Sequence, residues 1–261
     1  MSATTFPTAA TPLDPATRDT RPTLARLIAV ELRKMVDTRA GLWLLLATGG
    51  LTLLIVVVVC ITGEATDQTW ARLTEAATLP ASVLLPIIGI LLVSSEWSQR
   101  SALVTFALVP HRGRVLLAKL LAGVGLAIAA FVLCIAVAAV ATAVTATTAP
   151  GQWSLSLAML LQILVNVVQG MVMGIGFGAL FLASAPGIVF YFVLPIAWSI
   201  IGEIDALTGV AEWLDGSKSL DPLTDHLMSA TEWARACTTL LVWTALPVVA
   251  GWMRIRREEL K

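Results

Sequence analysis

The sequence predicts an all-α membrane protein with six transmembrane helices, an N-terminal amphipathic interface helix and both termini in the cytoplasm. The chain is 57% hydrophobic and only 13% charged, whereas about a quarter of the residues of a soluble domain are charged. No charged residue or histidine occurs from Leu120 to Gly202. At about 20 residues per crossing, this stretch is long enough for three spans.

The N-terminal region divides into two parts. Residues 1–21 are rich in Thr, Ala and Pro and contain no apolar core of signal-peptide type, so we expect a disordered cytoplasmic tail. The segment 22–38 is expected to be a helix, because its apolar residues recur on one face, with basic residues and Asp37 elsewhere: Leu24, Ile28, Leu32 and Met35. This helix can lie in the lipid headgroup plane; a plain cytoplasmic extension of the first span is the alternative.

Six apolar runs follow and form one domain over residues 22–261. Each run must be helical in lipid, because no water is present there to satisfy a bare backbone. Between the third and fifth runs we expect a polar break at 146–156 and a tight turn at 183–187, around Pro186. The predicted spans are 41–62, 76–95, 120–145, 157–178, 188–202 and 236–253.

Basic residues decide the predicted orientation. Of the 17 Lys and Arg residues, all but Arg72, Lys218 and Arg235 fall in the N-terminal region, the 96–119 loop or the C-terminal end. The positive-inside rule therefore places both termini and a coupling loop, 96–119, in the cytoplasm, with an acidic outer segment at 203–232.

Neither the cysteines nor the histidines indicate a catalytic, cofactor or metal site. Cys60, Cys134 and Cys237 have no metal-like spacing and are expected to be buried thiols. His111 and His226 are single, lie in loops on opposite sides, and are expected to be surface residues.

The 96–119 loop is the most informative short segment. Residues 98–109 can form about three helical turns, with Leu103 and Phe106 giving apolar surface outside the bilayer, and Pro110 ends this helix. Such a helix can dock in a groove of another protein; a solvated connector held at the lipid headgroups is the alternative.

The loop resembles that of type-2 ABC exporter permeases, especially actinobacterial ones. The resemblance rests on Glu96-Trp97, Arg100-Ser101, Pro110, Arg112, Arg114 and Lys119, and on Glu31-x-x-Lys34, Arg39 and Trp43 at the first span. It covers about 24–257. Ser101-Ala102 and the long polar tail depart from the family pattern.

The resemblance implies the permease subunit of an ATP-driven exporter in the plasma membrane, moving a hydrophobic or amphiphilic cargo out of the cell. Its implied partners are two copies of a separate ABC ATPase subunit, a second permease copy or paralogue, and the lipid bilayer, but no nucleic acid. ATP and Mg would lie on the ATPase; this chain is not expected to be an enzyme, and it has no phosphate-binding loop. The residues implied in coupling are Glu96, Arg100, Leu103, Phe106, Pro110, Arg112, Arg114 and Lys119. The cargo, and homodimer or heterodimer, stay open.

The fourth predicted span carries a polar stripe and a glycine stripe. Gln162, Asn166 and Gln169 share one helix face, and Gly170, Gly174 and Gly178 repeat beside them. Amides in hydrocarbon seek polar partners, and glycines allow close helix packing. This face is therefore expected to line a cargo path or a permease–permease seam, or to act only in packing between helices.

Other function classes fit less well or stay open. An ion-coupled secondary transporter usually has acidic residues or histidine within its spans, and five of the six runs have none. An intramembrane protease would need paired catalytic groups at membrane depth, which His111 and His226 cannot supply. A non-transporting membrane scaffold or immunity subunit is the main alternative.

Overall fold

The computed structural model describes residues 22–64, 68–99, 112–145, 151–204 and 208–257. Within these ranges the chain is helical and contains no strand. Six helices of the described residues are long and apolar enough to cross a membrane, the same number as the spans that the sequence predicts. They are α2 (Arg39–Thr62), α3 (Trp70–Ser98), α5 (Arg112–Thr145), α6 (Leu157–Phe181), α7 (Ser184–Ile201) and the segment Ala230–Arg257. The expected tail, 1–21, lies outside the described residues.

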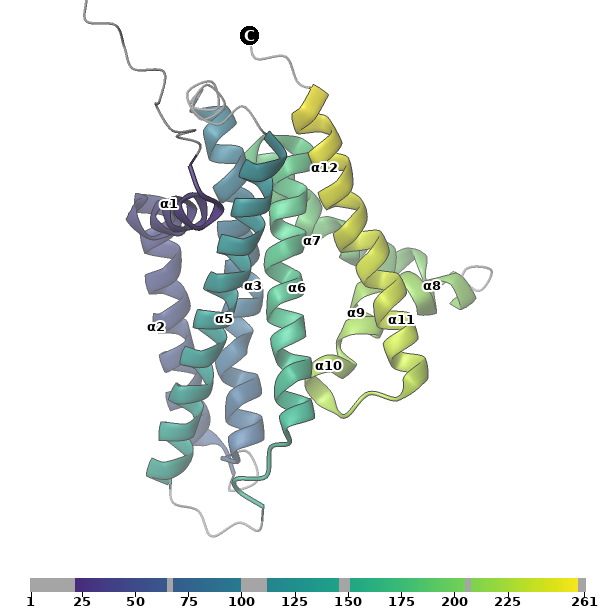
Figure 1. Ribbon diagram of the computed structural model, residues 1–261. Coiled ribbons are helices and arrows are strands. Elements are labelled where there is room, and N and C mark those ends of the chain that lie inside the picture. The colour runs from purple at the N-terminus through teal and green to yellow at the C-terminus, as the bar shows by residue number, and fades with distance from the viewer. Residues whose placement is uncertain (1–21, 65–67, 100–111, 146–150, 205–207, 258–261) are drawn as a thin grey trace, which may run out of the picture.

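The helix α1 (Leu24–Asp37) precedes the first span and crosses the end of the bundle at a steep angle to α2 (Figure 1). The Thr38 hydroxyl, which accepts from the Gly41 N–H at 3.2 Å, caps α2 and marks the corner between the two helices. Ile28, Leu32 and Met35 pack against the core, as the periodicity predicts. The position of α1 at a membrane interface stays a prediction.

The centre of the bundle is the contact between α3 and α6 (Figure 1). Glycines of α6 lie against the backbone of α3, so that a Cβ atom at Gly178 would be 2.7 Å from the Ile90 carbonyl oxygen, and one at Gly174 would collide with Pro86. Small residues allow two helix backbones to approach this closely. Leu73, Leu85 and other α3 side chains are fully buried around this contact.

Several of the predicted spans were shorter than the helices of the structure. The second span begins at Trp70 and ends at Ser98, and the third begins at Arg112, so Glu96 and residues 112–119 are helical and not part of a loop. A charged residue ends an apolar run, but it does not end a helix, whose backbone hydrogen bonds continue into water. The expected helix at 98–109 lies outside the described residues beyond Gln99.

The turn before α7 also differs from the prediction. It consists of Leu182, in the left-handed region with φ 55°, and Ala183. Pro186 and Gly187 lie within the first turn of α7. Proline is tolerated there because the first N–H groups of a helix have no partner within it.

The last span is built from α11 (Ala230–Leu240), a π-helical turn η2 (Leu241–Ala245) and α12 (Leu246–Arg257). Ser229 and Glu232 form a capping box that starts α11, so this span begins earlier than predicted. Before it come the short helices α8 (Thr208–Leu214), α9 (Gly216–Leu220) and α10 (Pro222–Asp225). The carbonyls of Trp213 and Leu214 accept hydrogen bonds from Thr239 and Trp243, which holds α8 against the last span.

The beginning and the end of the described chain lie at the same end of the bundle (Figure 1). Two guanidinium groups at the start of α5 bridge them. Arg114 Nη2 donates to the Pro22 carbonyl at 3.0 Å, and Arg112 Nη1 donates to the Ile255 carbonyl at 2.7 Å. An even number of spans requires this arrangement.

Candidate functional site

Four charged side chains from three helices form a closed ring at this end of the bundle. Lys34 Nζ lies 2.8 Å from Glu31 Oε1 and 2.6 Å from Glu96 Oε1. Lys119 Nζ lies 2.7 Å from Glu31 Oε2 and 3.0 Å from Glu96 Oε1. Each ammonium group therefore bridges both carboxylates, and the ring joins α1, α3 and α5.

The ring is buried and electrically balanced. The side chains of Glu31, Glu96 and Lys119 are 5%, 7% and 4% exposed, whereas Lys34 is 37% exposed. Lys119 also donates to the Leu92 carbonyl at 3.1 Å. Buried charges are costly unless they are paired and hydrogen-bonded; two cations on two anions meet this condition.

Lys34 remains charged in this setting. Burial alone would lower the pKa of Lys34, but the neighbouring carboxylates of Glu96 and Glu31 outweigh burial and raise this pKa above its ordinary value. The ammonium group of Lys34 is therefore a permanent part of the ring at neutral pH.

Each of these four charged residues has a defined position within its helix. Glu31 and Lys34 are three residues apart and neighbours on one face of α1, and Glu31 lies between Ile28 and Met35 on the buried face. Glu96 occupies the last turn of α3, and Lys119 follows two turns after the start of α5. The motifs carrying the family resemblance included all four residues, but their mutual contact was not predicted. An acidic residue on an otherwise apolar helix face was the available signal.

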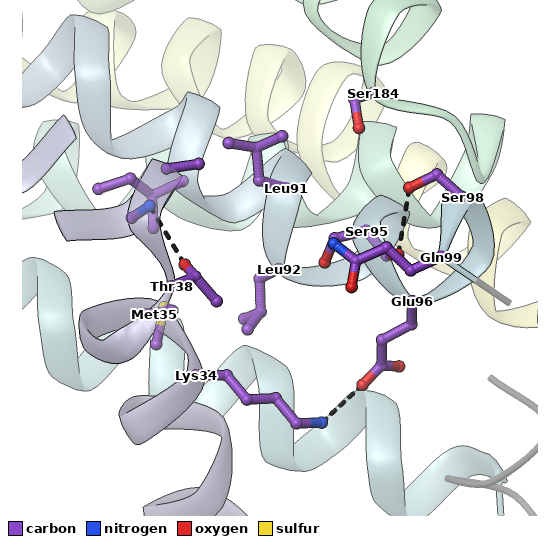
Figure 2. Close-up of a pocket in the computed structure, with 13 residues that line it drawn as sticks. Lys34, Met35, Thr38, Leu91, Leu92, Ser95, Glu96, Ser98, Gln99 and Ser184 are labelled. Carbon is purple, nitrogen blue, oxygen red and sulfur yellow. Dashed lines mark hydrogen bonds and ion pairs between the residues drawn. The ribbon is translucent and has the colours of Figure 1, made fainter. Parts of the chain in front are cut away.

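A cavity of about 450 Å³ opens beside the ring, between α1, the start of α2 and the end of α3. Figure 2 shows Lys34 and Glu96 reaching toward one another along its edge. Leu91, Leu92 and Met35 supply apolar walls, while serine and glutamine side chains near the end of α3 supply polar ones. Two members of the ring, Lys34 and Glu96, thus line the cavity in addition to linking helices.

The other predicted coupling residues are only partly described. Arg112 and Arg114 bind backbone carbonyls at the two chain ends, as given above. Arg100, Leu103, Phe106 and Pro110 lie outside the described residues, so their role stays a prediction.

The amide stripe of α6 is divided between different surroundings. Gln162 donates to the His226 carbonyl at 2.8 Å and accepts from the Met228 N–H at 3.2 Å, which ties α6 to the outer segment. Gln169 lines a second cavity, of about 300 Å³. Asn166 is half-buried and lines neither cavity.

The glycine stripe of α6 faces inward. Gly174 and Gly178 lie against the backbone of α3, and Gly170 lies near the side chains of Pro86 and Tyr191. These contacts are made within one chain and are of the helix-packing kind. A role of the stripe in a seam between two permeases stays a prediction.

In the described part of the chain, the cysteines and histidines belong to no group of residues that could hold a metal ion. Cys134 is buried and Cys60 half-buried, but Cys237 is exposed, contrary to the prediction, because its face of α11 points away from the bundle. His226 has two acidic neighbours that the sequence reading missed: Asp225 at 3.3 Å and Glu232 at 2.9 Å. His111 lies outside the described residues.

The charge ring can hold α1, α3 and α5 together and can transmit a displacement between these helices. The chain matches no protein-family model, and no curated protein matches it. A function for this chain is therefore inferred from the ring, the two cavities and the sequence motifs.

Proposed function

We propose that this chain is the permease subunit of an ATP-driven exporter that moves a hydrophobic or amphiphilic cargo with a separate ATPase subunit. The observation that supports this proposal is the charge ring. Lys119 bridges the start of α5 to Glu96 at the end of α3, and these two helices flank the segment predicted to dock the ATPase.

The ring gives that segment a mechanical connection to the spans. A force applied to residues 100–111 would be transmitted to α3 and α5 together, because the bridge between Glu96 and Lys119 resists separation of these two helices. Glu31 extends the connection to α1 and thereby to α2. An isolated scaffold has no evident need for such a link at this position.

The basic residues support the orientation in which this end faces the cytoplasm. Within the described residues, Arg26, Arg33, Arg39 and the arginines of α12 belong to elements at the end of the bundle that holds the ring (Figure 1), while only Arg72, Lys218 and Arg235 belong to the opposite end or the outer segment. In this orientation the ATPase would bind at the ring, and the partners would be two ATPase copies and a second permease in the plasma membrane.

Purification of the tagged full-length chain from its native host in mild detergent tests the proposal. We expect an ATPase subunit and ATP hydrolysis to co-elute with the chain. Replacing Leu103 and Phe106 together by Asp should abolish this co-elution, because a charge in an apolar docking helix opposes burial. The control is Leu227→Asp, at an apolar residue of the outer segment that is 57% exposed.

This purification experiment has two outcomes that count against the proposal. A chain that elutes without any ATPase, or one that retains its ATPase equally in both variants, would contradict the proposal. The first outcome would favour the alternative of a membrane scaffold or immunity subunit.

A further inference from the structure

The second cavity, of about 300 Å³, lies between α6, α7, α9 and the last span. Gln169 contributes to it from α6, and Tyr191 and Phe192 contribute from α7. Trp243 lies on the π-helical turn, and such turns are frequent at functional sites. Gln169 lies about 18 Å of helix beyond the start of α6.

Hydrogen-bond acceptors without partners gather around this cavity. The buried Oε1 atom of Gln169 accepts no hydrogen bond. Pro195 has no N–H group to donate to the Tyr191 carbonyl four residues earlier in α7. The exposed Asp221 carboxylate, which also lines the cavity, forms no hydrogen bond or ion pair with any residue of the described ranges. A ligand that donates hydrogen bonds would satisfy such groups.

The acidic side chain that lines this cavity is Asp221, and two further carboxylates lie near it. Although Asp221 is exposed as a residue, partial desolvation of its carboxyl group, together with the nearby carboxylates of Asp215 and Asp225, raises the pKa of Asp221 above its ordinary value. Two basic side chains of the outer segment and α11 pair with other acids, Lys218 with Glu203 at 3.5 Å and Arg235 with Glu212 at 2.8 Å. No basic residue is among the lining residues of this cavity in the described ranges.

The apolar walls limit the kind of cation. Tyr191, Phe192 and Trp243 present aromatic surface, and aromatic faces attract organic cations more than neutral molecules. The cavity volume falls at the lower end of the range for small-molecule sites. A bare metal ion would find too few oxygen ligands, whereas an organic cation would use both the aromatic and the acceptor groups.

We propose that this cavity binds an amphiphilic organic cation, with its charged group at Asp221 and Gln169 and its apolar body against Trp243. The ligand would be cargo, and only this last identification rests on the proposed function. The pattern is specific: three acceptors, three aromatic residues and no neutralising cation at one cavity.

Binding of ethidium to the purified full-length chain in nanodiscs of zwitterionic lipid tests the inference. Phenanthridine, which has the same ring system but is neutral at pH 7, is the matched probe. Ethidium should bind at least tenfold more tightly than phenanthridine, and Asp221→Asn should weaken ethidium binding about tenfold. Glu203→Gln, which removes an exposed acid paired with Lys218, should leave ethidium affinity unchanged.

A steric pair of variants checks the site independently of charge. A Cβ atom at Gly216, which lines the cavity, or at Gly209, which does not, would meet no atom within 4 Å. Gly216→Leu should therefore fold normally and reduce ethidium binding, while Gly209→Leu should not change it. Equal affinities for both probes, or an undiminished affinity in both Asp221→Asn and Gly216→Leu, would overturn the inference. Since no ATPase is present in this assay, that failure would leave the ATPase-docking proposal intact.

Discussion

Replacing Lys119 by methionine should expose the energetic weight of the charge ring. Lys119 is 4% exposed and provides both the 2.7 Å bridge to Glu31 and the 3.0 Å bridge to Glu96. The variant keeps most of the side-chain volume but leaves the two buried carboxylates of the ring with one ring cation, Lys34, in place of two. Removing one partner of a buried ion pair costs about 3–5 kcal/mol of unfolding free energy, and we expect a loss in this range.

A second substitution should recover part of that loss. In Lys119→Met combined with Glu31→Gln, the ring again carries one positive and one negative charge. The double variant should therefore lose about 2–3 kcal/mol less unfolding free energy than the sum of the two single variants. Arg33→Met and Asp37→Asn provide the matched control on α1: their ion pair is 83% and 66% exposed and should contribute less than about 1 kcal/mol.

Unfolding in mixed micelles, followed by circular dichroism as the SDS fraction increases, measures these free energies. The cycle for Lys119 and Glu31 and the cycle for Arg33 and Asp37 should be run under identical conditions. Additive losses in the Lys119 cycle, or a loss for Lys119→Met no larger than that for Arg33→Met, would refute the view that the ring holds α1, α3 and α5 together.

Three further predictions concern α6 and the outer segment. Gly174→Ala should cost about 1–3 kcal/mol, because its Cβ atom would collide with the α3 backbone, whereas Gly50→Ala, which meets no atom within 4 Å, should be neutral or stabilising in the same unfolding assay. Gln162→Leu should increase hydrogen exchange around 222–229, because the outer segment loses its bonds to α6. Hydrogen bonds to Glu232 and Asp225 raise the pKa of His226 above 6.5, so these ion pairs stabilise the fold at low pH and are lost as pH rises through the raised value; NMR titration should show this pKa falling in Glu232→Gln.

The number and type of the spans follow from the sequence with little ambiguity. A hydrocarbon layer accepts only apolar residues in quantity and demands internally satisfied backbone, so the apolar runs had to be helices. The buried face of α1 was predictable for a similar reason, because Ile28, Leu32 and Met35 recur at helical spacing. The ends of the helices were predicted less well, since charge marks the edge of an apolar run and not the last backbone hydrogen bond.

For the candidate site, the residues could be predicted from the sequence but their contacts could not. Glu31, Lys34, Glu96 and Lys119 could be singled out locally, but Lys34 was expected away from the apolar face of its helix, and its partner Glu96 lies 62 residues away. Gln169 was expected on a face that lines a cargo path or a permease–permease seam or acts only in packing, but Asp221, which lines the same cavity from a different segment, was not connected with it. No local pattern encodes such pairs.

The sequence alone thus determined that this protein is helical, how often it can cross a membrane and which end is rich in basic residues, because transfer of each side chain from water to lipid is a local property. The tertiary structure decided which charges neutralise each other and which carboxylate is left without a cation. These outcomes depend on distances of about 3 Å between separate helices, and only the packing of α1, α3 and α5, and of α6 against the outer segment, sets those distances.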